Sequence, residues 1–110
     1  MTRRYKILQV IDFLHVGGAE RVCVTLSNLL FKATHEVAVL ILVNDGELAN
    51  SLDKNIPIIR LNRHNKYSLI TMYKCAKILS NYELIHVHMR HNYRYIQLIK
   101  RVFFVKTKVI

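Results

Sequence analysis

Residues 6–28, KILQVIDFLHVGGAERVCVTLSN, decide the fold of this chain. The apolar run over residues 7–13 is too short for a helical repeat and is typical of a buried parallel strand. After Gly17 and Gly18, apolar residues recur at the spacing of a helix with one buried face. These residues are Ala19, Val22, Cys23, Leu26, Leu29 and Leu30. The stretch therefore predicts a strand, a glycine turn and a helix.

The glycine pair predicts a place where an anion can bind. Gly17 and Gly18 can take backbone angles closed to other residues, and they leave the free N–H groups of the helix start uncovered. These groups and the helix dipole favour phosphate, by about 0.3–1 kcal/mol for one exposed charge. Glycine also occurs at such turns for steric reasons alone, so the residues leave both interpretations open. The turn lacks the third glycine of G-x-G-x-x-G and the Lys-Ser/Thr pair of a P-loop, which disfavours NAD binding.

The rest of the chain alternates between strand and helix patterns. Further strands are predicted over residues 37–43, 56–61, 83–89 and 106–110, with a short helix over 47–53 and longer helices over 69–80 and 94–103. The residues expected to point inward from the two longer helices are Leu69, Met72, Tyr73, Ala76, Leu79, Ile96, Ile99, Val102 and Phe103. The alternation predicts an α/β fold, a Rossmann-like parallel sheet with helices on both faces. In the usual winding the first strand lies between the second and fourth, so residues 15–18 and 88–92 should line one cleft.

The positive charge of the chain lies in its second half. Residues 1–59 carry six Lys/Arg and six Asp/Glu, whereas residues 60–110 carry eleven Lys/Arg and a single acidic residue, Glu83. This asymmetry points to a membrane surface, a nucleic acid or a phosphorylated substrate, although a solvated basic face needs no ligand. No apolar run approaches the roughly 18 residues of a membrane span, and no cleavable signal peptide is apparent, so we expect a cytoplasmic protein. Cys23 and Cys75 are expected to be small core residues.

Three histidines follow one another near the predicted cleft. His86 and His88 are two apart in a strand and should share a face, and His91 follows in the loop. We expect no metal, because no Asp or Glu stands nearby to orient the rings. His86 is expected to be a hydrogen-bonded core residue. His88 is the stronger candidate for contact with a ligand, followed by Arg90 and His91, and no catalytic residue can be assigned.

Three segments resemble the N-terminal domain of family 4 glycosyltransferases with the GT-B fold. They are KILQVIDFLHVGGAERVCVTLSNLL (residues 6–30), DGELANSLDKNIPIIRL (residues 45–61) and ELIHVHMRHN (residues 83–92). The resemblance covers essentially the whole chain. It implies metal-independent transfer of a sugar, with retention of configuration, from a nucleotide diphosphate sugar to an acceptor such as a cell-surface polysaccharide or a lipid-linked glycan. No cofactor is implied.

The resemblance also assigns roles to residues at matching positions. It implies that Gly17 and Gly18 offer N–H groups to the donor diphosphate, and that His88, Arg90 and His91 lie near the acceptor or the reacting sugars. Family members are roughly three times as long, and their C-terminal domain supplies most nucleotide contacts and the E-x7-E carboxylates. Residues 1–110 are therefore expected to form part of an N-terminal, acceptor-side domain, inactive without its partner domain and peripheral on the inner face of the membrane. The alternative is a non-enzymatic basic module that binds nucleic acid or an anionic membrane surface, with Tyr93 and Tyr95 near arginines.

Overall fold

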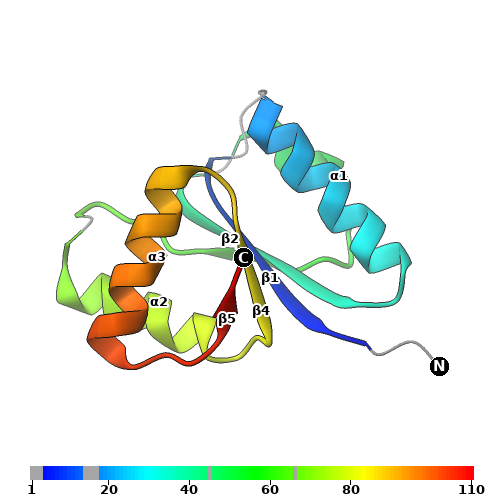
Figure 1. Cartoon of the computed structure of the whole chain (residues 1–110). Helices are drawn as coiled ribbons and strands as arrows, with labels where there is room; N and C mark the ends of the chain where they lie inside the picture. Colours follow the sequence, from blue (N-terminus) through cyan, green and yellow to red (C-terminus); the bar gives the residue numbers. More distant parts are fainter. Residues whose placement is uncertain (1–3, 14–17, 45, 66) are drawn as a thin grey trace.

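The computed structural model describes residues 4–13, 18–44, 46–65 and 67–110. Its centre is a five-stranded parallel sheet with the strand order β3-β2-β1-β4-β5 (Figure 1). The elements follow the chain as β1 (Lys6–Phe13), α1 (Gly18–Lys32), β2 (Glu36–Asn44), the 3-10 helix η1 (Glu47–Ser51), β3 (Ile58–Arg60), α2 (Leu69–Leu79), β4 (Leu84–Val87), α3 (Arg90–Phe103) and β5 (Lys108–Val109). The predicted α/β class and the place of the first strand between the second and fourth are confirmed.

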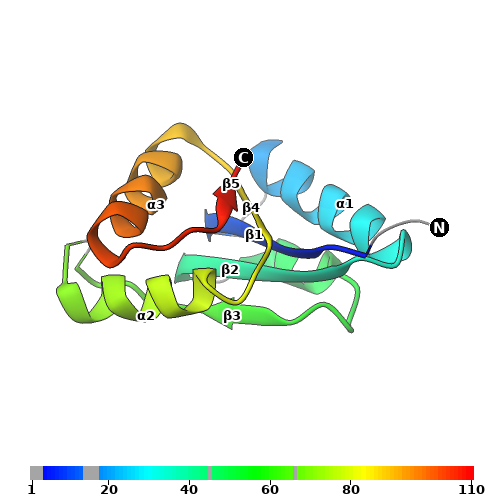
Figure 2. The same cartoon turned by 60° about the horizontal axis from the view of Figure 1, so that its bottom comes forward.

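Helices cover both faces of the sheet, with α1 and η1 on one face and α2 and α3 on the other (Figures 1 and 2). Two apolar clusters fill the layers, because successive side chains of a strand point to opposite faces. From β1, Leu8 and Val10 pack toward α2 and α3, whereas Ile11 packs toward α1. A polar side chain in β1 therefore needs its hydrogen-bond partner on the side of the sheet to which it points.

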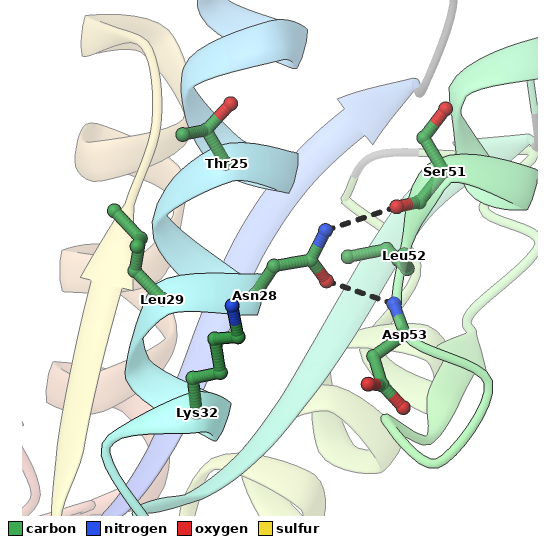
Figure 3. Close-up of a pocket in the computed structure, with 7 residues that line it drawn as sticks. All are labelled: Thr25, Asn28, Leu29, Lys32, Ser51, Leu52 and Asp53. Carbon is green, nitrogen blue, oxygen red and sulfur yellow. Dashed lines mark hydrogen bonds between the residues drawn. The ribbon is translucent and has the colours of Figure 1, made fainter.

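Asn28 ties α1 to the end of η1 and to the segment that follows it (Figure 3). Its amide Nδ2 donates to the carbonyl of Ser51 at 2.9 Å, and its Oδ1 accepts from the N–H of Asp53 at 2.8 Å. A hollow of about 420 Å³ lies between the two segments and is lined by these residues together with Thr25 and Lys32. It opens along the second half of α1, away from the carboxyl ends of the strands. We therefore regard it as a gap in the packing between two segments and not as a ligand site.

The sequence periodicity overestimated how much of each helix is buried. Among the residues expected to point inward, Val22, Leu29, Leu69, Tyr73 and Val102 are exposed. Each helix is covered by the sheet on one side only, so residues at the edge of an apolar stripe stay in solvent. The deeper residues of the same stripes are buried as predicted, including Leu79, which is fully buried.

This difference gives a matched pair of substitutions within α2. Replacing Leu79, with 0% exposure, by Ala should lower the free energy of unfolding by about 2–5 kcal/mol, since it leaves a cavity in the core. Replacing Leu69, which is 68% exposed, should change it by no more than about 0.5 kcal/mol. Urea denaturation of the two variants tests the pair, and equal losses would contradict the placement of α2.

Candidate functional site

The site lies where the carboxyl ends of β1 and β4 meet. These strands are parallel neighbours, paired from Ile7 with Leu84 to Val10 with Val87, so their ends share one edge of the sheet. Helix α1 begins after β1, and α3 begins after β4 (Figure 1). Residues 14–17, including the predicted ligand contact Gly17, lie outside the described part of the chain.

Gly18 is the first residue of α1 and is open to its surroundings. A Cβ placed on it meets no heavy atom within 4 Å among the described parts of the chain. Its φ is not in the left-handed region, so the expectation that glycine is needed there for its backbone angles is wrong for Gly18. What glycine provides at this position is space beside the free N–H groups at the helix start.

The turn between β4 and α3 is tighter than the sequence indicated. Strand β4 ends at Val87 and α3 begins at Arg90, so the predicted loop over residues 90–93 is already helical. The joint is Met89, whose φ of 78° lies in a region that side chains other than glycine rarely occupy. Asn92 secures the turn, because its buried Nδ2 donates to the carbonyl of His88 at 3.1 Å. A backbone outlier held in this way is typical of functional sites.

His88 is turned into the protein on the α1 side of the sheet. Its N–H donates to the carbonyl of Val10 at 3.0 Å, and its Nε2 lies 2.7 Å from Oε1 of Gln9. The residue is 7% exposed, and its ring centroid lies 4.4 Å from that of His86. Burial, together with the neighbouring His86 ring, lowers the pKa of His88 to about 4. His88 is therefore a neutral imidazole bound to Gln9, and its contact with a sugar stays a prediction.

His91 lies on the opposite side of the sheet and binds a carboxylate. Its Nε2 is 2.6 Å from Oδ2 of Asp12, although the sequence analysis expected no carboxylate near the histidines. That expectation was wrong because Asp12 precedes His91 by 79 residues, and only the pairing of β1 with β4 brings them together. The His91 side chain stays half exposed, whereas Arg90 beside it is exposed at the start of α3. The structure thus separates His88 from the other two predicted contacts.

Asp12 also pairs with a guanidinium that the sequence analysis did not single out. Nη2 of Arg63 lies 3.6 Å from Oδ1 of Asp12, and both side chains are almost fully buried. The Arg63 N–H donates to the carbonyl of Leu42 at 2.9 Å, which fixes the residue at the end of β2. The guanidinium carbon lies 4.8 Å from the ring centroid of Tyr95, an arrangement typical of a cation–π contact.

The sequence did contain one signal for these residues. Gln9 and Asp12 are the two polar residues in the otherwise apolar run over residues 7–13 of β1, and both are buried. A buried polar group needs a partner, so each should have pointed to a polar residue on a neighbouring element. Arg63 carried no such signal, because it lies in a basic segment with several other candidates.

Neither metal chemistry nor thiol chemistry finds support in the described residues. No group of three or more His, Cys, Asp or Glu side chains comes close enough there to hold a metal ion. Cys23 and Cys75 are buried free thiols, as predicted for core residues. Burial raises the pKa of each to about 12, so both remain protonated at neutral pH. The site therefore offers hydrogen bonds and positive charge.

The buried His88 predicts a pH dependence of stability. An unfolded histidine binds a proton near its usual pKa of 6.5, but folded His88 does so only near pH 4. The unfolded state therefore gains protons first, and stability should fall by about 3 kcal/mol as the pH drops from 6.5 to 4. Urea denaturation across this range should show a smaller loss for His88→Gln, which cannot take up a proton. An identical pH profile in that variant would contradict the assignment.

Solved structures of glycosyltransferases share this architecture. The chain superposes on the Anabaena protein Alr3699/HepE, crystallised in complex with UDP and glucose, with a TM-score of 0.71 and 18% identity over 96% of its length. It superposes on a glycosyltransferase from Rickettsia africae ESF-5 with a TM-score of 0.70 and 22% identity over 98% of its length. In each case the chain spans 29% of the matched protein.

The sequence itself carries a family signature. No curated protein matches it. The family model described as Glycosyltransferase Family 4 matches residues 16–106, which include α1, the turn at Met89 and α3. The fold matches part of the GT-B architecture, as the resemblance implied. The chain therefore belongs to glycosyltransferase family 4, of which it represents the N-terminal region.

Proposed function

We propose that this chain is the acceptor-side part of a retaining glycosyltransferase that moves a sugar from a nucleotide diphosphate sugar to an acceptor. The observation that carries the proposal is the open start of α1 at Gly18, on the edge where β1 and β4 end. Ligands of open α/β sheets bind at this edge. The Anabaena protein, whose fold this chain shares, was crystallised with UDP and glucose.

The chemistry assigned to the glycine turn is stabilisation of the leaving diphosphate. As the bond between the sugar and the diphosphate breaks, negative charge grows on the phosphate oxygens. Backbone N–H groups at Gly17 and Gly18, together with the helix dipole, would stabilise that charge without having to reorganise. His88, Arg90 and His91 would lie on the side of the sugars. The chain spans 29% of each matched protein, and we assign the remaining donor contacts to a C-terminal domain beyond residues 1–110.

Substitutions at Gly18 test the diphosphate role in a longer protein that contains this chain and a nucleotide-sugar domain. Gly18→Asp should reduce sugar transfer by about 100-fold or more, because a carboxylate replaces part of an anion site. Thr25→Asp, on the exposed side of the same helix, should retain transfer within about twofold. Transfer of radiolabelled sugar measures both, and unimpaired transfer by Gly18→Asp would refute the role. Circular dichroism of both variants separates lost chemistry from lost folding.

A second candidate function, attachment to an anionic membrane, is favoured by the outer surface of α2 and α3. These helices pack side by side and contain no acidic residue (Figure 2). We define the basic surface as their exposed cations Lys74, Lys77, Arg94 and Arg101 with the exposed apolar residues Leu69, Ile70 and Tyr73. Ile70 is 71% exposed. Apolar side chains among lysines and arginines are typical of helices that lie on anionic lipid.

The basic surface accords with a peripheral protein on the inner face of the membrane and a lipid-linked acceptor. No helix in the described residues is long and apolar enough to span a bilayer. Nucleic acid fits less well. Tyr95, one of the two tyrosines expected near arginines, is 2% exposed beneath Arg63 and is not available to stack on a base. A lipid surface is therefore the partner that we favour for the basic surface.

Vesicle binding tests this surface with the chain itself. The chain should co-sediment with phosphatidylglycerol vesicles and not with phosphatidylcholine vesicles. The double substitution Lys74→Glu and Lys77→Glu should weaken binding by about tenfold or more, since each basic residue near the lipid contributes about 1 kcal/mol. The matched control, Lys32→Glu with Lys54→Glu, makes the same change of charge on exposed residues outside α2 and α3. Equal losses in both pairs, or tighter binding to single-stranded RNA, would overturn the membrane assignment.

A further inference from the structure

A cavity that no residue of α1 lines lies between α3 and the segment before α2. It has a volume of about 330 Å³ and is lined by Tyr67, His91, Arg94, Tyr95 and Leu98. His91 and Arg94 lie three residues apart on α3, so they share a face of the helix. Tyr95 and Leu98 are the apolar part of the lining. The size is at the lower end of the range for small-molecule sites.

His91 links this cavity to the buried carboxylate of Asp12. Asp12, paired with Arg63, acts as an acceptor, so the His91 nitrogen 2.6 Å away, Nε2, is the one that carries a hydrogen. In a neutral imidazole the other nitrogen, Nδ1, then keeps its lone pair. Because Nε2 is occupied, Nδ1 is the ring nitrogen left for a ligand, and in the neutral ring it can accept a hydrogen bond from a hydroxyl.

The charges around the cavity favour a negative group in the ligand. Arg94 is exposed and has no ion-pair partner among the described residues. Asp12, the carboxylate that contacts His91, is already paired with Arg63 at 3.6 Å. The positive end of the α3 dipole lies at Arg90 and His91 and adds to the same field. An anion can therefore enter without meeting an uncompensated negative charge.

We propose that this cavity binds the phosphate monoester of a sugar or polyol. Arg94 takes the phosphate, His91 accepts a hydrogen bond from a neighbouring hydroxyl, and Asp12 is a positioning residue that fixes the His91 tautomer. A guanidinium matches the geometry of phosphate oxygens. The inference rests on the proposed function only in identifying this phosphate ester with the acceptor of the sugar; the binding site itself follows from the cavity, the tautomer and the charges.

NMR titration of the chain with glucose 6-phosphate tests the binding. Amide signals of the first two turns of α3 should shift, and glucose or inorganic phosphate alone should bind at least about fivefold more weakly, because each offers only half of the contacts. Arg94→Gln should weaken binding of glucose 6-phosphate by about tenfold. Lys106→Gln removes the same charge from an exposed residue outside both the cavity and the basic surface, and it should change affinity by less than about twofold. Equal losses in the two variants would mean that net charge alone attracts the phosphate, and the site would be rejected.

The nitrogen-15 shifts of the His91 ring test the role of Asp12. The ring should be in the Nε2–H form, and Asp12→Asn, whose amide can donate as well as accept, should reduce the share of that form. With fewer rings in that form, fewer His91 side chains can accept a hydrogen bond from the sugar hydroxyl at Nδ1. Glucose 6-phosphate and inorganic phosphate should then bind Asp12→Asn about equally. A dominant Nδ1–H form in the unsubstituted chain would overturn the positioning role. If Asp12→Asn does not fold, His91→Gln provides the same comparison, since it leaves the pair between Asp12 and Arg63 intact.

These results are independent of the donor experiment. Loss of transfer in Gly18→Asp concerns the start of α1, whereas glucose 6-phosphate binding concerns α3. If the chain binds glucose 6-phosphate but the longer protein transfers no sugar, the site stands and the proposed function fails. If transfer depends on Gly18 but glucose 6-phosphate does not bind, the cavity is not a sugar phosphate site and the proposed function stands.

Discussion

The central position of β1 governs where every candidate site residue lies. Because β1 is paired with β2 on one side and β4 on the other, it is buried on both edges and both faces. Two of its buried residues are nevertheless polar, Gln9 on the α1 side and Asp12 on the α2 and α3 side. A side chain of Gln9 or Asp12 without a partner in the interior would lower the stability of the fold by about 1–3 kcal/mol, and by more for the carboxylate of Asp12. His88 and His91 are therefore drawn to opposite sides of the sheet edge.

This separation divides the edge of the sheet into two chemical environments. On the α1 side lie the open helix start at Gly18 and a neutral, buried His88. On the other side lie a carboxylate, two arginines and a half-exposed His91 beside a cavity. A transferase has to hold two substrates at once without letting one take the place of the other. The two proposed ligands, a diphosphate at α1 and a hydroxylated phosphate ester at α3, would meet this requirement by binding on different sides of one sheet edge.

The architecture could be predicted from the sequence because it depends on local patterns. The apolar run of β1, the glycine turn and the helical repeat of α1 are each contained in a few residues, and the usual doubly wound order then places β1 between β2 and β4. The site could be predicted only in part. His88 and His91 were recognised as candidates, but their partners Gln9 and Asp12 are 79 residues away, and no local pattern states which pair forms. The exposure of Leu69 and Tyr73 was also missed, since a helical stripe shows which side faces inward but not how wide the covering layer is.

The same sequence separation affects how the protein is made. On the ribosome, β1 emerges long before its partners, and at about 5–20 residues per second the 79 residues to each histidine take roughly 4 to 16 seconds to synthesise. During this interval Gln9 and Asp12 lack their histidine partners and must stay hydrated. The strand that later forms the middle of the sheet therefore cannot be fully buried before those partners are synthesised. The nascent chain thus carries an exposed apolar strand until β4 and the start of α3 have been synthesised, which makes that strand a natural target for chaperones.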